Sequence, residues 1–245
     1  MGELDGRVAI VTGSSSGIGE ATARRLAGLG CHVVVNSASS VRAGEAVAES
    51  LPTESLYVQA DISDQDQGHA LIARSIERFG RLDILINNAG WTRVVDHADL
   101  DALTDEIFRR TFEVNVFGTW WLTKAAMPFL RQSPDPLVVI VTSVAGIRPV
   151  GSSIAYAMSK AALNHMVALL AKSSGPVRVN AVAPGLVETP LTAQMHAEHA
   201  ATAAAVPMHR SAHPDDCAEA VIALVRNTYV TGHVMVVDGG STLVW

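Results

Sequence analysis

Apolar and polar positions along this chain follow two alternating patterns. Short, nearly continuous apolar runs are typical of parallel strands covered on both faces. They alternate with longer stretches in which apolar residues recur every three or four positions, as on one face of a helix. The runs predict strands at Val8–Val11, His32–Val35, Leu56–Gln59, Leu82–Ile86, Leu137–Val141, Val177–Ala181 and His233–Val237. The stretches predict helices at Gly17–Leu29, Val41–Leu51, Gln65–Phe79, Thr104–Leu130, Ser152–Lys172 and Pro214–Val225.

This alternation predicts an α/β fold: a doubly wound, mostly parallel, seven-stranded sheet of Rossmann-like type, with helices on both faces. No linker, repeat or low-complexity stretch interrupts it, so residues 1–245 are predicted to form a single domain. Ligands of such sheets bind at the carboxyl ends of the strands. Residues that directly follow a strand are therefore the candidates for function.

Composition narrows the class of protein. Hydrophobic residues make up 49% and charged residues 17% of the chain, which indicates a large buried core. The net charge of −6, with scattered basic residues, argues against nucleic acid or an anionic membrane as the main partner. No signal-like segment or run of twenty apolar residues occurs, and no membrane span is predicted. Cys31 and Cys217 are expected to be free core thiols, so the expected location is the cytoplasm.

A glycine-rich turn joins the first predicted strand to the first helix. Gly13 permits a tight turn, Gly17 lets the backbone approach a pyrophosphate, and Gly19 lets helix and strand pack closely. The helix that follows directs its free amide groups at the phosphates. An ordinary Gly/Ser turn is the alternative. The candidate phosphate-binding residues are Gly13, Ser15, Ser16, Gly17, Ile18 and Gly19.

Tyr156 and Lys160 lie early in the predicted helix Ser152–Lys172 and share one face of it. A free phenol, with a pKa of about 10, is a poor acid or base near neutrality. A nearby ammonium favours the phenolate and lowers that pKa. Ser143 follows the fifth strand, 13 residues before Tyr156, and can be a simple strand-end cap; the family resemblance described below implies that it holds a substrate oxygen beside the tyrosine.

Further motifs follow the other strands in order. Asp61-Ile62 follows the third strand, and Asn87-Asn88-Ala89-Gly90 follows the fourth. Pro184-Gly185, with Val187 and Thr189 behind it, follows the sixth strand, and Val236 to Gly240 form Val-Val-Asp-Gly-Gly. With the spacing Gly-x-x-x-Gly-x-Gly and with Tyr-x-x-x-Lys, the chain resembles the short-chain dehydrogenase/reductase family from Gly6 to Gly240.

The resemblance implies a role for each motif. Asp61 would lie near the adenine and the stretch after Pro184 would hold the nicotinamide carboxamide, so the implied cofactor-binding set adds Asn36, Ser37, Asp61, Ile62, Asn88, Ala89, Gly90, Tyr156, Lys160, Pro184, Gly185, Val187 and Thr189. The implied catalytic set is Asn115, Ser143, Tyr156 and Lys160. Asn115 would anchor a water in a proton relay, or bond to backbone at a helix distortion, or do both. Asp61 could instead cap a helix.

The implied activity is hydride transfer between a nicotinamide cofactor and a carbonyl or secondary alcohol carbon. Tyr156 would act as general acid/base, and Lys160 would lower its pKa and bond the nicotinamide ribose. A 3-oxoacyl-thioester reductase is a more specific alternative. A dinucleotide-sensing regulator without turnover is a second one, but such a protein would be expected to have lost Tyr156 or Lys160.

The end of the second strand bears on cofactor choice. An enzyme for NAD usually carries an acidic residue there, which bonds the ribose 2′-hydroxyl and would repel a 2′-phosphate. Asn36 is the residue predicted at that point and carries no charge, so NADP(H) is expected to be preferred, with NAD(H) possible. The substrate, a small carbonyl or alcohol, is expected under a covering segment over residues 186–213, against Trp91, Ile147 and Val150.

Assembly and metal content complete the predictions. The resemblance implies a homo-oligomer, a tetramer first and a dimer second, paired through the helices Thr104–Leu130 and Ser152–Lys172 and the apolar chain end at Trp245. No metal site is predicted, because His196 and His199 do not have the spacing of a zinc-protease motif.

Overall fold

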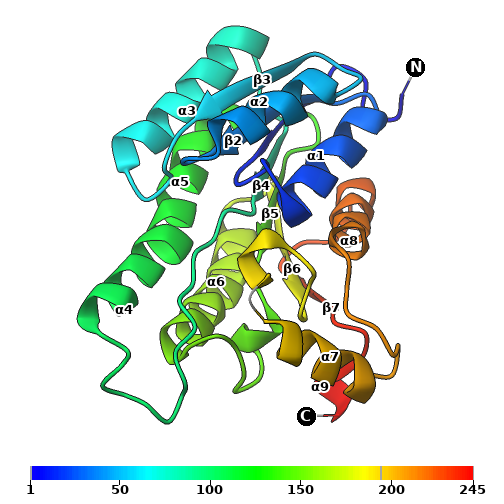
Figure 1. Cartoon of the computed structure of the whole chain (residues 1–245). Helices are drawn as coiled ribbons and strands as arrows, with labels where there is room; N and C mark the ends of the chain where they lie inside the picture. The colour runs from blue at the N-terminus through cyan, green and yellow to red at the C-terminus, as the bar shows by residue number, and fades with distance from the viewer. Residues whose placement is uncertain (1, 194, 245) are drawn as a thin grey trace.

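The computed structural model describes residues 2–193 and 195–244, and its centre is one seven-stranded sheet in the order β3-β2-β1-β4-β5-β6-β7 (Figure 1). Every pairing of neighbouring strands is parallel. The strands are β1 (Val8–Val11), β2 (His32–Ser37), β3 (Ser55–Gln59), β4 (Ile84–Asn87), β5 (Leu137–Val141), β6 (Arg178–Pro184) and β7 (Val234–Val237). The predicted fold class is confirmed, and β1 and β5 have the predicted bounds.

Helices cover both faces of this sheet, as predicted. One apolar core lies under α1, α2 and α8, and the other lies under α3, α5 and α6. The helices are α1 (Gly17–Gly28), α2 (Val41–Ser50), α3 (Gln65–Phe79), α4 (Asp105–Phe112), α5 (Thr119–Leu130), α6 (Ile154–Ser173), α7 (His196–Ala205), α8 (Pro214–Arg226) and α9 (Ser241–Val244). Short turns of helix are η1 (Glu113–Gly118), η2 (Val144–Gly146) and η3 (Pro190–Thr192).

The predicted helix Thr104–Leu130 is not uniform. A π-helical turn, η1, separates α4 from α5 and contains the candidate residue Asn115. The apolar periodicity continues across the turn, so the pattern of apolar residues does not reveal the wider winding. π-Turns of this kind are frequent at functional sites.

Two helices, α7 and α9, were missed by the sequence patterns. They lie close together beside the C-terminus (Figure 1). α7 is a short Ala-rich segment with little amphipathic character, and α9 has only four residues. Of the features predicted here, Gln194 in the substrate-covering segment and Trp245 at the chain end lie outside the described residues.

Among the described residues, α6 is the one helix long and apolar enough to cross a membrane, by length and composition alone. That is weak evidence of a membrane span, because helices of globular proteins pass the same test. Its inner face contributes Leu163 and Val167 to a core, and it also buries the polar residues Ser159 and Lys160. Much of its outer face is left uncovered in the single chain.

Candidate functional site

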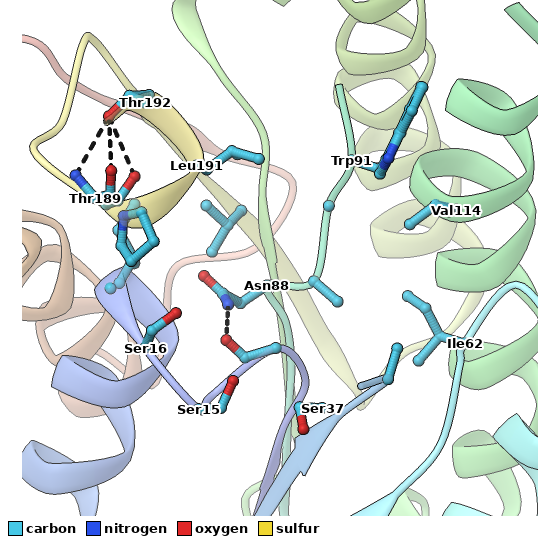
Figure 2. A pocket seen from close by; sticks show the side chains of 18 of the residues that line it. Ser15, Ser16, Ser37, Ile62, Asn88, Trp91, Val114, Thr189, Leu191 and Thr192 are labelled. Carbon is cyan, nitrogen blue, oxygen red and sulfur yellow. Dashed lines mark hydrogen bonds between the residues drawn. The ribbon is translucent and has the colours of Figure 1, made fainter. Parts of the chain in front are cut away.

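A cavity of about 540 Å³ opens at the carboxyl ends of the strands (Figure 2). Segments that follow six different strands converge on it, as the topology of a doubly wound sheet requires. It brings together nineteen of the predicted site residues: Gly13, Ser15, Ser16, Gly17, Ile18, Asn36, Ser37, Asp61, Ile62, Asn88, Ala89, Gly90, Ser143, Tyr156, Lys160, Pro184, Gly185, Val187 and Thr189. Gly19 and Asn115, the other two predicted site residues, are not among the residues that line the cavity.

The glycine turn is packed so tightly that a side chain does not fit at Gly13 or Gly19. Gly13 has φ +61°, and a Cβ there would come 2.9 Å from the Cα of Ala89. A Cβ on Gly19 would lie 2.4 Å from the carbonyl oxygen of Gly13. The side-chain amide of Asn88 donates to the carbonyls of Thr12, at 2.8 Å, and Gly13, at 3.1 Å. The turn is thereby bound to the end of β4 and leaves a bare cradle in front of α1.

Asn36 does not have the position predicted for it. β2 continues through Asn36 to Ser37, and the Asn36 side chain is buried. Its amide donates to the carbonyls of Val58 and Ala60, both at 3.0 Å, and its oxygen accepts from the backbone of Gly13. The Asn36 side chain therefore forms its hydrogen bonds within the protein. Ser37, whose hydroxyl lies 2.8 Å from that of Tyr57, is the residue that ends the strand at the cavity (Figure 2).

Asp61 is paired inside the protein as well. Its carboxylate accepts from the backbone and hydroxyl of Ser63 and forms an ion pair with Arg110 of α4 at 3.0 Å. Burial raises the pKa of Asp61, but these donors outweigh it and the net pKa is lowered. The cap of α3 is Asp64, so the alternative that Asp61 caps that helix is wrong. Arg110 lines the cavity and was not predicted, because its partners are distant in sequence.

The catalytic candidates are positioned by caps. Ser143 is buried, and its hydroxyl accepts from the backbone of Ala145 at 3.1 Å to begin η2. The hydroxyl of Ser153 accepts from the backbone of Tyr156 at 3.2 Å to begin α6. The two caps fix Ser143 and Tyr156 in one corner of the cavity. The capping alternative for Ser143 is thus correct and leaves its pocket-lining position intact.

Lys160 crosses from α6 to the end of β5. Its ammonium donates to the carbonyl of Val141 at 2.9 Å and lies 5.5 Å from the centre of the Tyr156 ring. Burial lowers the pKa of Lys160 to about 8. Burial also raises the pKa of Tyr156, and a hydrogen bond with the Ser143 hydroxyl acts in the opposite direction. The predicted lowering of the Tyr156 pKa by Lys160 is therefore not found in the protein alone, where desolvation has the larger effect.

Asn115 ties three segments together from behind the cavity. It is fully buried in η1. Its side chain accepts from the backbone N–H of Trp91 at 2.8 Å and donates to the Trp91 carbonyl at 3.0 Å. It also donates to the hydroxyl of Ser159, which in turn donates to the carbonyl of Tyr156. The backbone-bonding alternative for Asn115 is confirmed, and Ser159 is a connecting residue that the sequence did not reveal.

The far end of the cavity is the expected substrate end. Trp91 lines it as predicted, whereas Ile147 and Val150 do not. Instead the wall opposite Trp91 comes from the segment after β6, with Val187, Leu191 and Thr192. The sequence predicts that residues 186–213 cover the substrate, but it does not predict which of their side chains line the cavity.

The polar groups of the cavity are unevenly distributed. Its charged side chains are Asp61, Arg110 and Lys160, and all three have partners within the protein. Serine hydroxyls gather near the glycine turn and the end of β2, where Ser15, Ser16 and Ser37 lie (Figure 2). The cradle without side chains and these small donors fit a dinucleotide, and Ser143 with Tyr156 fits a carbonyl oxygen.

Comparisons with known proteins agree with this geometry. A family model described as enoyl-(acyl carrier protein) reductase matches residues 13–242. The granaticin polyketide synthase putative ketoacyl reductase 2 of Streptomyces violaceoruber is 52% identical over 96% of both chains. A short-chain dehydrogenase of Burkholderia cenocepacia in complex with NADP has a TM-score of 0.90 and 33% identity, covering 98% of this chain and 99% of that one. A 3-ketoacyl-(acyl-carrier-protein) reductase of Brucella melitensis complexed with NADH has a TM-score of 0.91 and 32% identity, covering 97% and 99%.

Proposed function

The chain belongs to the short-chain dehydrogenase/reductase family, and from this premise we propose that it transfers a hydride between NADP(H) and a carbonyl or secondary alcohol carbon, with Tyr156 as the general acid/base. The observation that carries the proposal is the meeting of Ser143, Tyr156 and Lys160 in one cavity with the bare cradle in front of α1. The relatives named above are reductases and dehydrogenases, which supports the reaction class.

In this proposal the bound nicotinamide supplies the hydride, and the protein supplies orientation and the proton. Ser143 holds the carbonyl oxygen, and the Tyr156 hydroxyl donates its proton to that oxygen as the carbon is reduced. The ammonium of Lys160 stabilises the phenolate that remains, because a positive charge nearby favours the ionised phenol. Asn115 bonds the Trp91 backbone and, through Ser159, the carbonyl of Tyr156. It thereby holds the start of α6, which carries Tyr156, in place against the Trp91 segment. Alcohol oxidation follows the same path in reverse.

The finer version of the proposal is reduction of a 3-oxoacyl thioester. Two of the relatives carry a ketoacyl reductase name, one of them at 52% identity over nearly the whole chain. The regulator without turnover has no comparable support, since Tyr156 and Lys160 are both present in the cavity.

For the cofactor, NADP(H) is favoured by the uncharged end of β2. Ser37 ends that strand, and Ser39 and Ser40 line the cavity beside it. Hydroxyl groups can donate to a 2′-phosphate, and no carboxylate stands at the strand end to repel one. The solved relatives contain NADP in one case and NADH in the other, so NAD(H) remains the second cofactor.

We also propose that the protein is a cytoplasmic homo-oligomer, a tetramer first and a dimer second. Partly exposed aromatic side chains on η1 and α5, Phe117 and Trp120, and the uncovered apolar face of α6 would be buried by pairing. Light scattering at micromolar concentration tests this assembly, and a species of 25.8 kDa alone would contradict it.

The test of the activity is consumption of reduced cofactor. The purified chain is incubated with NADPH or NADH and with a panel of 3-oxoacyl thioesters, aromatic ketones and sugars, and the absorbance of the reduced nicotinamide is followed. We expect turnover of at least one ketone or thioester, faster with NADPH. Tight binding of NADPH with no turnover of any carbonyl or alcohol in the panel would favour the regulator instead.

A further inference from the structure

The backbone of Trp91 is held on both sides by one side chain. Asn115 accepts from its N–H and donates to its carbonyl, at 2.8 and 3.0 Å. Because Asn115 is completely buried and also bonded to Ser159 of α6, the clamp joins Trp91 to the helix that carries Tyr156. The position of the Trp91 backbone relative to the catalytic corner is therefore set by the fold.

The residues after Trp91 are fastened to the loop in front of α6. The hydroxyls of Thr92 and Ser152 lie 2.5 Å apart, and the backbone of Val95 donates to the Ser152 carbonyl at 2.8 Å. The ring of His97 bonds the carbonyl of Gly151 at 3.1 Å. With three attachments over residues 92–97, this loop forms a wall that is bound to the segment in front of α6.

Trp91 and Leu191 lie on opposite sides of the cavity (Figure 2). The indole is partly buried, and Leu191 keeps 45% of its surface exposed although it lines the cavity. Val187 extends the apolar wall on the Leu191 side. The side chains of Trp91, Val187 and Leu191 are apolar and uncharged, and the same cavity is lined by Ser143 and Tyr156.

Among the described residues that line the cavity, every charged side chain already has a partner within the protein. Asp61 and Arg110 pair with each other near the end of β3, and the ammonium of Lys160 is bonded to the carbonyl of Val141. A carboxylate or phosphate next to the reacting carbonyl would thus lose its water, and it would compete with the Tyr156 phenolate for the one ammonium there, Lys160, among the described lining residues. The reacting part of the substrate must be uncharged.

We propose that the slot between Trp91 and Leu191 selects flat, uncharged aromatic ketones, whose ring stacks on the indole while the carbonyl oxygen reaches Ser143 and Tyr156. A rigid ring loses little conformational freedom on binding, and the indole offers it an offset-stacked partner. A flexible aliphatic chain gains area but no stacking, and it has rotors to immobilise. Trp91 is then the residue that determines specificity, and this inference rests on the proposed carbonyl reduction.

The test compares two bicyclic ketones that differ in flatness. β-Tetralone has a fused aromatic ring, and β-decalone has the same carbon skeleton fully saturated. With NADPH, the wild type is expected to have the higher kcat/KM for β-tetralone. Trp91→Leu should lower kcat/KM for β-tetralone by roughly two- to tenfold through KM, and change β-decalone less than about twofold. Trp91→Phe, which keeps an aromatic face, should retain most of the preference.

Tyr229→Leu is the matched control. Tyr229 is 98% exposed before β7, far from the cavity lining, and removal of its ring should leave both ketones unaffected. Equal losses for both ketones in Trp91→Leu, or a wild type that does not prefer β-tetralone, would overturn the inference. Reduction of linear 3-oxoacyl thioesters with neither bicyclic ketone accepted would also overturn it and leave the proposed function standing. Absence of turnover with every carbonyl tested would contradict both this inference and the proposed function.

Discussion

The cofactor end and the substrate end of the cavity are built from different materials. At the cofactor end, backbone packs on backbone: a Cβ on Gly13 or Gly19 would meet main-chain atoms, and the side-chain amides of Asn36 and Asn88 donate to carbonyl groups. At the substrate end, side chains bond to side chains. The ring of His199 lies within 3.3 Å of the Thr192 hydroxyl and 3.1 Å of the Ser211 hydroxyl.

This difference separates two demands on one site. The dinucleotide is the same molecule in every turnover, and an end formed from backbone and side-chain amides suits it because a Cβ added at Gly13 or Gly19 would clash. Substrates vary, and an end formed from side chains of the segment after β6 can change without disturbing the sheet. The catalytic corner of Ser143, Tyr156 and Lys160 lies where the two ends meet. Substitutions at each place should therefore have different consequences.

The largest effect is expected at that junction. Tyr156→Phe removes the hydroxyl that donates the proton and should lower kcat by on the order of 10²- to 10⁴-fold. The affinity for NADPH, measured by fluorescence titration, should change less than about threefold, because the cradle is built elsewhere. Turnover close to that of the wild type would show that Tyr156 does not donate the proton. It would also contradict the assignment of the catalytic site to the place where the two ends of the cavity meet.

Lys160 should make the free energy of unfolding of the protein depend on pH. Burial lowers its pKa from 10.5 to about 8. Between these values the unfolded chain holds a proton that the folded protein has released, so the free energy of unfolding rises with pH over that window. Relative to Lys160→Met, the cofactor-free wild type should gain on the order of 3 kcal/mol from pH 7 to pH 11. Urea unfolding across this range measures the gain, and a constant difference would contradict the burial of a charged amine.

Two glycines of α1 test how tightly the cofactor end is packed. Gly19→Ala places a Cβ 2.4 Å from the Gly13 carbonyl oxygen and should lower the free energy of unfolding by about 1–3 kcal/mol, with weaker NADPH binding. Gly28→Ala is its control in the same helix, since a Cβ there meets nothing within 4 Å. We expect that variant to be unchanged or more stable by up to about 1 kcal/mol. Equal costs at the two positions would refute the close packing.

Ser37→Asp tests the choice of cofactor at the end of β2. A carboxylate at this position would repel a 2′-phosphate and accept from a 2′-hydroxyl, so the ratio of kcat/KM for NADH to that for NADPH should rise by about tenfold. Asn36→Asp is the contrast, because its side chain is bonded to the carbonyls of Val58 and Ala60. Asn36→Asp should lower the free energy of unfolding without an equal change in the ratio of kcat/KM for NADH to that for NADPH. The opposite result, a switch at Asn36 and none at Ser37, would reverse the assignment.

The smallest effect is expected from a substitution in the substrate-covering segment after β6. His199→Ala removes the ring between the Thr192 and Ser211 hydroxyls and should raise KM for the ketone roughly two- to fivefold, as expected for one or two weak hydrogen bonds. NADPH affinity should not change. His69→Ala, an exposed histidine of α3, is the control and should leave KM unaltered. A larger loss in NADPH affinity than in ketone KM would show that this segment belongs to the cofactor end.

The sequence predicted best what depends on local patterns. β1, α3 and β5 have the predicted bounds, because apolar runs and periodicity define them. Asn36 shows where this reasoning fails. A polar residue after three valines suggested the end of a strand, but its amide is satisfied by carbonyls of the neighbouring strand, and β2 runs on to Ser37. Partners so far apart in sequence leave no local trace.

The same limit applies to the candidate site. The glycine turn, Ser143, Tyr156 and Lys160 could be predicted, since each directly follows a strand or shares a helix face. The clamp of Asn115 on Trp91 could not, and neither could the Asp61–Arg110 pair, since both join elements far apart in the chain. The inward position of Leu191 depends on how η3 packs against the rest, which no periodicity encodes.

The most direct test of the proposed reaction follows the hydride itself. NADPH deuterated at the transferable position of the nicotinamide ring is mixed with excess enzyme and the best ketone of the panel, and the alcohol is analysed by mass spectrometry after a single turnover. The proposal predicts that the wild type places one deuterium on the carbinol carbon, while Tyr156→Phe binds the cofactor and forms almost no alcohol. An alcohol without deuterium, or labelled alcohol formed equally fast by Tyr156→Phe, would contradict it.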